Sequence, residues 1–171
     1  MAETVSHISE HGNYQQFLDD FQQTIQDATP RLKSISDDDA SKSSDGHWSP
    51  KQELGHLIDS AANNHQRFVR GQFMDDLVFP GYDGDQWVEA QKYNNATWSD
   101  LVDLWSAYNT HLVYVVSLIP EAVRTQQRDK HSFDRVAFVT VDQGNPTTLE
   151  YLIRDYLVHL KHHLDQIWSN T

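Results

Sequence analysis

The segment 147–168, TTLEYLIRDYLVHLKHHLDQIW, constrains the fold most strongly. Its apolar residues recur at steps of three and four, which places them on one side of a helix: Leu149, Leu152, Ile153, Tyr156, Leu160, Leu164 and Ile167. Thr147 and Glu150 have the spacing of a capping box, and Pro146 precedes them. The segment therefore predicts a long amphipathic helix that must pack its apolar side against other elements.

Three earlier segments show the same period and are bounded by cap or proline signals. The first covers 12–28 and ends at Thr29-Pro30. The second covers 49–73; it begins at an N-cap Ser49 followed by Pro50 and ends near Phe73. The third covers 97–119; Thr97 and Asp100 have capping-box spacing, and the segment stops at Pro120. Four amphipathic helices joined by at least two long connections predict an all-α four-helix bundle that is not a simple up-down-up-down arrangement. We expect residues 1–171 to form a single domain.

The connections differ in character. Residues 34–46 are polar and lack the alternating ligands of a calcium loop, so we expect a solvated loop. Residues 74–96 are irregular, with a short helix predicted at 86–93; Trp87 and Tyr93 there are expected to pack onto the bundle rather than wall a pocket. Residues 136–141 are β-prone and predict a short strand or hairpin before the last helix.

Composition excludes several classes of protein. The chain has no cysteine, which excludes a disulfide framework, a zinc ribbon and a cysteine nucleophile. Its net charge of −12 repels nucleic acid and anionic lipid. The apolar run at 112–119 falls far short of the ~20 residues that span a bilayer, and residues 1–16 lack a signal segment. We expect a soluble, cytoplasmic protein and keep a homodimer as one alternative.

Two histidines in the last helix are candidates for metal ligands. His159 and His163 lie ~40° apart around the helix axis, with Cβ atoms ~6 Å apart, so both rings can reach one cation. His162 falls outside the apolar arc. Two histidines at a bundle surface explain this spacing as well, since the chain has ten histidines and chance pairs are common. A third ligand from another segment is needed to decide.

The helix at 49–73 carries a polar stripe that either faces solvent or lines a wet cavity: Glu53, His56, Ser60, Asn63 and Arg67. Glu53 and His56 form an ExxH motif, as in di-iron carboxylate bundles, but no second ExxH precedes His159, His162 or His163. A single metal on three histidines and the absence of any metal remain as alternatives. His111, at the edge of the third helix's apolar face, is expected to bond a carbonyl at the edge of the core.

Two segments resemble the DinB-like (DinB/YfiT) metalloprotein superfamily. WSPKQELGHL at 48–57, followed by Asp59 and Arg67-Phe68, is similar to its second helix, and HLKHHLDQI at 159–167 is similar to its last helix. The resemblance extends over essentially the whole chain in length and helix order. It implies a four-helix bundle with a long crossover, and it implies that His56, His159 and His163 are the three metal ligands.

The resemblance also implies a chemistry. Three imidazoles leave a coordination position open, which is typical of a reactive site rather than a closed structural one. Nitrogen donors accept several divalent metals, so we expect zinc, nickel or iron. Acceptors for the outer ring nitrogens are expected among Glu53, Asp59, Asp155 and Gln166, whereas catalytic residues are not indicated.

Members of the superfamily include thiol-dependent transferases and isomerases, and proteins described as metal-dependent hydrolases. The sequence therefore predicts a metal-dependent enzyme that acts on a small molecule, with a low-molecular-weight thiol as a possible partner. The alternative is a non-enzymatic metal-binding or stress-linked protein of the same family.

Overall fold

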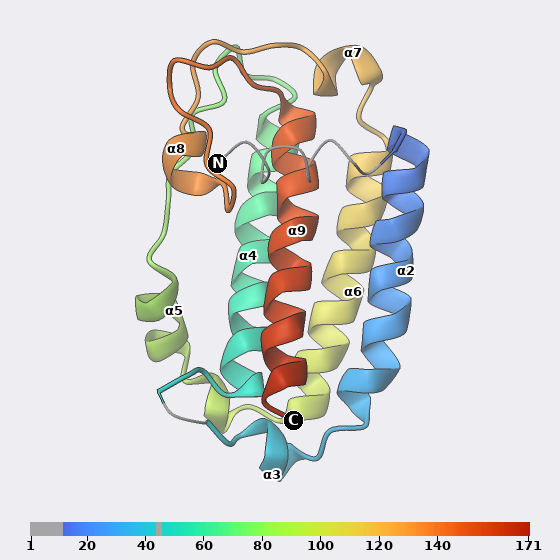
Figure 1. Cartoon of the computed structure of the whole chain (residues 1–171), viewed down its shortest axis with the longest axis vertical. Coiled ribbons are helices and arrows are strands. Elements are labelled where there is room, and N and C mark those ends of the chain that lie inside the picture. Colours follow the sequence, from blue (N-terminus) through green and yellow to red (C-terminus); the bar gives the residue numbers. More distant parts are fainter. Residues whose placement is uncertain (1–11, 44–45) are drawn as a thin grey trace.

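Four long helices lie side by side in the computed structural model, which describes residues 12–43 and 46–171 (Figure 1). They are α2 (Tyr14–Lys33), α4 (Pro50–Arg70), α6 (Trp98–Ser117) and α9 (Leu149–Ser169). Helix α4 packs against α6 and α9, and α2 packs against the same two helices, so α2 and α4 lie diagonally across the bundle. The predicted all-α four-helix bundle is confirmed.

The helix directions require long connections, as predicted. Figure 1 shows α2 and α9 running one way, and α4 and α6 running the other. Helices α4 and α6 are parallel neighbours, so residues 71–97 must return along the bundle; they carry α5 (Gly84–Gln91) and the 3₁₀ turn η1 (Tyr93–Asn95). Residues 118–148 join α6 to α9 and carry α7 (Glu121–Arg124) and α8 (Phe133–Val136). Helix α9 thus runs antiparallel to its neighbour α4, so the start of α4 faces the end of α9.

The apolar faces of the helices meet in a core that contains one fully bonded polar pair. Trp105, Phe17 and Phe68 are fully buried. Among them, the Tyr156 hydroxyl donates to Asn109 Oδ1 at 2.6 Å, and Asn109 Nδ2 donates to the Trp105 carbonyl at 2.9 Å. Burial of these polar groups is tolerated because each has a partner.

The predicted ends of two helices are wrong. Helix α2 does not stop at Thr29-Pro30 but contains Pro30 and continues to Lys33. A proline in the last turn removes only its own N–H bond, while Leu32 gains full burial and its carbonyl accepts the Trp98 indole N–H at 2.8 Å. Helix α4 ends at Arg70, short of Phe73, which is 84% exposed and has no burial to prolong the helix.

The predicted loop at 34–46 contains a one-turn helix, α3 (Asp37–Ala40), capped by Ser36. Asp37 Oδ1 accepts the Trp98 backbone N–H at 2.8 Å, and its Oδ2 accepts the Lys51 ammonium at 2.9 Å. The capping box predicted from Thr97 and Asp100 is therefore wrong, because the start of α6 is capped from α3 instead. Ser44 and Asp45 of this loop lie outside the described residues, as do most of residues 1–16, where no signal segment was expected.

The strand predicted at 136–141 is also wrong. Helix α8 is followed by irregular chain with bends at 137–139, in which the backbone N–H groups of Phe138 and Val139 donate to Asp155 at 2.8 and 2.7 Å. β-Propensity describes how well side chains fit a pleated surface, and here a carboxylate takes the place of a partner strand. Within the described ranges, β pairing is limited to two isolated bridges, Leu77 with His131 and Arg128 with Thr147.

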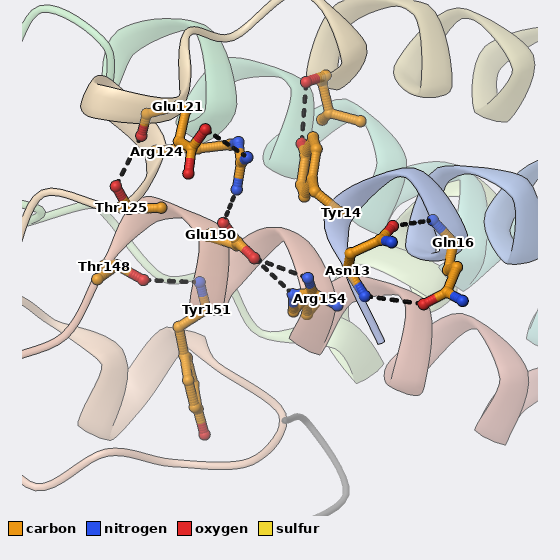
Figure 2. A network of polar contacts seen from close by, with 11 residues as sticks. Asn13, Tyr14, Gln16, Glu121, Arg124, Thr125, Thr148, Glu150, Tyr151 and Arg154 are labelled. Carbon is orange, nitrogen blue, oxygen red and sulfur yellow. Dashed lines mark hydrogen bonds and ion pairs between the residues drawn. The ribbon is translucent and has the colours of Figure 1, made fainter. Parts of the chain in front are cut away.

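The end of the bundle farthest from α3 is fixed by ion pairs (Figure 2). The N-cap of α9 is Thr148, which accepts the Tyr151 N–H at 3.1 Å, so the predicted Thr147–Glu150 box is off by one residue. Glu150 instead binds the guanidinium groups of Arg124 and Arg154. Arg124 lies over the Tyr14 ring, 3.8 Å from its centroid, which ties α7 and α9 to the start of α2.

No helix in the described part of the chain is long and apolar enough to cross a membrane. The assignment of residues 1–171 to a single domain stays a prediction.

Candidate metal centre

The antiparallel pairing of α4 and α9 brings three histidines together. His56 comes from the second turn of α4, and His159 and His163 come from successive turns of α9. His56 Nε2 lies 3.2 Å from His159 Nε2, and one nitrogen from each of the three rings lies within 4.8 Å of the others. The sequence reasoning placed His159 and His163 side by side, but only the family resemblance placed His56 with them.

The outer nitrogen of each ring has a different environment. His163 Nδ1 contacts Glu53 Oε2 at 2.7 Å, and His159 Nδ1 lies 3.4 Å from Ser60 Oγ. These contacts occupy Nδ1 of His163 and of His159 and leave Nε2 of each ring as the candidate ligand atom. His56 Nδ1 is buried and has no hydrogen-bond partner among the described residues. Helix α5 closes over this ring at Gly84, where an added Cβ would lie 3.1 Å from His56 Cε1.

Burial keeps two of the rings neutral. Burial, together with the smaller effect of the nearby His163, lowers the pKa of His56 to about 4. Burial, followed by the charges of His163 and His56, holds the pKa of His159 well below its ordinary value. Neutral imidazoles present free lone pairs at neutral pH, and a metal ion requires this of a histidine ligand.

Aromatic side chains surround the cluster on the side that faces the connection 71–97. The Trp48 ring lies 5.1 Å from the His56 ring and 6.3 Å from the His163 ring, centroid to centroid. The centroid of the Tyr82 ring lies 6.3 Å from that of His56 and 4.8 Å from that of Trp87. Tyr93 is buried and packs onto the bundle, as expected. Trp87 is 40% exposed and contacts the ring of Tyr82, which lines a cavity.

A cavity of about 200 Å³ opens beside His56 and His159. One side of it is a stripe along α4, formed by His56, Ser60, Asn64 and Arg67. The polar stripe seen in the sequence thus lines a cavity rather than facing solvent, although Asn64 takes the place expected of Asn63. Tyr82 and the segment 135–138 form other walls, and no pattern in the sequence indicated them because they belong to irregular connections.

The predicted outer partners behave differently from one another. Glu53 contacts His163, as expected. Asp59 accepts from Gln91 and Tyr93 at 2.7 and 2.8 Å, away from the rings. Asp155 holds the backbone of Phe138 and Val139. Gln166 is half-buried, and it makes no hydrogen bond to the three rings within the described part of the structure.

Two other histidines were assessed from the sequence. His162 is exposed, with its ring centroid 5.2 Å from that of His163, so the preference for His163 as the inward-facing residue is confirmed. His111 is exposed and lies edge-on to His65, with centroids 5.2 Å apart, rather than bonding a carbonyl at the core edge. The prediction for His111 was wrong.

The cluster fits a single divalent ion. Nitrogen ligands ~2.1 Å from a tetrahedral zinc ion lie ~3.4 Å from each other, and His56 Nε2 and His159 Nε2 are separated by 3.2 Å. The outer nitrogen of His163 has the carboxylate partner that metal-bound imidazoles usually have. Among the described residues no carboxylate joins the group, which disfavours a di-iron centre.

The fold and this cluster define a class of protein, an α-helical bundle in which two antiparallel helices bring three imidazoles to the edge of a cavity. Residues 20–167 match the DinB superfamily, and the chain belongs to this family. The structure is similar to that of YfiT from Bacillus subtilis, described as a probable metal-dependent hydrolase with an unusual four-helix bundle topology. The TM-score is 0.73, and the match covers 94% of this chain and 89% of that one at 21% identity, which shows a common fold. No curated protein matches the sequence.

Proposed function

We propose that the protein is a metal-dependent enzyme that acts on a small molecule, with His56, His159 and His163 as the ligands of one divalent ion. The observation that carries this proposal is the convergence of three ring nitrogens beside an open cavity. A site with three protein ligands and access to a cavity leaves room for substrate, unlike a closed structural site. Zinc, nickel and iron all suit nitrogen donors.

The bound ion would supply Lewis acidity and lower the pKa of a water molecule or a thiol beside it. The chain's own residues have supporting roles. Glu53 orients His163 by accepting its Nδ1 proton, and Trp48 shields the rings of His56 and His163 from solvent. Burial raises the pKa of Tyr82 to about 12, so its hydroxyl stays protonated and can donate to a substrate in the cavity.

The ligand assignment is tested by metal analysis of protein purified without a histidine tag. We expect about one divalent ion per chain in the wild type and its loss in the H56A/H159A/H163A triple variant. His162→Ala is the matched control, because His162 is adjacent to His163 but exposed. Retention of stoichiometric metal by the triple variant would overturn the assignment.

Two reactions are compatible with such a site, hydrolysis and thiol transfer. Because the chain has no cysteine, a thiol nucleophile has to arrive as a second substrate. Electrophilic substrates incubated with and without low-molecular-weight thiols separate the two reactions. A transferase requires the thiol, whereas a hydrolase turns over without it.

A second candidate is a non-enzymatic metal-binding or stress-linked protein, which the same histidine cluster would also serve. It predicts that the protein binds stoichiometric metal but does not turn over electrophilic substrates, with or without a low-molecular-weight thiol. We favour the enzyme because the cavity reaches both His56 and His159. The cytoplasmic location and the homodimer expected from the sequence stay predictions.

A further inference from the structure

The cavity beside the three histidines contains a buried guanidinium. Arg67 is 5% exposed and lines the cavity together with His56. The two residues are eleven positions apart on α4, which is about three helical turns, so they lie on the same side of the helix. Ser60 and Asn64 fill the stripe between them. A ligand in this cavity therefore has the histidine cluster at one end and Arg67 at the other.

Arg67 contacts only neutral groups. Its Nη1 donates to Asn64 Oδ1 at 3.3 Å and to the Val136 carbonyl at 3.5 Å, and its Nη2 donates to the Pro80 carbonyl at 3.1 Å. Within residues 12–43 and 46–171, no carboxylate forms an ion pair with it. A guanidinium has more N–H groups than these three contacts use, so donors remain available for a further oxygen.

The acidic residue that lines the cavity is Asp155, whose charge attracts that of Arg67, but within the described ranges it forms neither an ion pair nor a hydrogen bond with the guanidinium. Asp155 uses one oxygen to accept the Phe138 N–H and the other to accept the Val139 N–H. Burial raises the pKa of Asp155 to about 6, although its two backbone contacts and the charge of Arg67 act in the opposite direction. Arg135 adds a second positive charge, exposed on the cavity wall, and its Nε lies 3.7 Å from Asp134 Oδ2. In a chain with 25 acidic and 13 basic residues, this cavity has an excess of positive charge.

We propose that Arg67 forms an anion subsite and that the small molecule bound in this cavity carries a carboxylate or a similar oxyanion. A buried charge without an ionic partner is costly, so a ligand that supplies the opposite charge is favoured. The planar guanidinium fork suits two oxygens of one carboxylate or phosphate. The inference that this ligand is the substrate rests on the proposed function, because it places the reacting group of the ligand beside the three histidines.

The size of the cavity limits the ligand. Its volume of about 200 Å³ is below the roughly 300–1,000 Å³ typical of pockets for drug-sized ligands. A short carboxylate with one reactive group fits this space. A thiol cosubstrate would have to enter from the open side or bind only in part.

The test uses metal-free protein, so that no metal ion can capture the anion. Propionate and propionamide are titrated separately, because they have nearly the same shape and differ in charge. We expect propionate to bind at least about 10-fold more tightly and to shift the Arg67 Nε–H resonance in ¹H–¹⁵N spectra. Inorganic phosphate, titrated in parallel, shows whether the subsite prefers a carboxylate or a phosphate.

Variants of Arg67 provide the second arm. Arg67→Gln keeps N–H donors for the Pro80 and Val136 carbonyls but removes the charge, and we expect it to lose about 10–100-fold in propionate affinity. Arg67→Lys keeps the charge without the fork and should retain part of that affinity. Arg135→Gln is the matched control for an arginine of the same cavity that is exposed, and its loss should be under about 3-fold.

Equal binding of propionate and propionamide to the wild type would overturn the subsite, whether or not Arg67→Gln folds. Undiminished propionate binding by a folded Arg67→Gln variant would overturn it as well. Neither result affects the metal analysis, and loss of the metal assignment leaves the metal-free titration interpretable. The two proposals can therefore fail separately.

Discussion

Glu53 Oε2 lies 2.7 Å from His163 Nδ1, although Glu53 belongs to α4 and His163 to α9, 110 residues later in the chain. Both side chains are largely buried, with 7% and 15% of their surfaces exposed. A carboxylate in this position accepts the Nδ1 proton and so directs the lone pair of Nε2 toward His56 and His159. The contact couples the assembly of the bundle to the orientation of a proposed metal ligand.

Removal of the Glu53 carboxylate should weaken metal binding. We expect Glu53→Gln and Glu53→Ala to lower zinc affinity by about 10–100-fold, with the alanine variant lower, because the ring loses its outer acceptor. Competition with a chromogenic chelator measures the change. Glu89→Gln, an exposed carboxylate on α5, is the control and should bind zinc like the wild type. Unchanged affinity in Glu53→Ala would contradict the role.

The helices and the histidine pair of α9 were predictable because they depend on local periodicity. A spacing of four residues places His159 and His163 on one side of any helix, whatever the helix packs against. His56 was not predictable in this way. Its position on α4 is polar, and whether a polar stripe faces water or a cavity depends on the residues 80–84 and 135–138 that cover it.

The missed details share a different cause, because each depends on a contact between segments far apart in sequence. Asp37 caps α6 across 61 residues, which displaced the local cap at Thr97. Asp155 satisfies the backbone at 138–139, which removed the need for a partner strand. Arg67 appeared in the sequence as one member of a polar stripe, and only the three-dimensional structure shows that its hydrogen bonds to described residues all go to neutral groups.

Removal of the Tyr156 hydroxyl should destabilise the core. Tyr156→Phe leaves the buried Asn109 Oδ1 without its donor, and we expect a loss of about 2 kcal/mol in the free energy of unfolding. For a chain of this size that corresponds to a fall in Tm of roughly 4–8 °C. Tyr114→Phe, on an exposed face of α6, should change Tm by under about 2 °C. Thermal unfolding followed by circular dichroism measures both, and equal values for the two variants would contradict the prediction.

Gly55 permits the close approach of η1 to α4. A Cβ added there would lie 2.1 Å from Tyr93 Cδ2, and Tyr93 is itself buried and bonded to Asp59. We expect Gly55→Ala to cost about 1–2 kcal/mol, because overpacking outweighs the gain in helix propensity.

Denaturant unfolding measures this cost, and Gly144→Ala, where nothing lies within 4 Å, should be neutral. In a double-mutant cycle, Tyr93→Leu should remove most of the Gly55→Ala penalty. Additive effects of the two substitutions would show that the clash is not with Tyr93.

Asp155 should give the metal-free protein a characteristic dependence on pH. Its pKa is raised from 3.8 to about 6, mainly by burial. The folded state therefore binds this proton more tightly than the unfolded state does, and stability from this group is present below about pH 4 and lost as the pH rises to about 6. The shift corresponds to about 3 kcal/mol. The lowered pKa of His56 acts in the opposite direction, because the unfolded state binds that proton more tightly and stability rises with pH between about 4 and 6.5.

Comparison with Asp155→Asn separates the two effects, because both proteins retain the histidines. The variant loses one acceptor for the backbone at 138–139 and should be less stable at pH 4. Since it has no carboxyl to ionise, its deficit relative to the wild type should shrink as the pH rises to about 7. Urea unfolding of the metal-free proteins at several pH values measures this difference. A deficit that stays constant from pH 4 to 7 would show that the Asp155 pKa is the same in the folded and unfolded states, and that its two backbone contacts hold the carboxylate in its charged form.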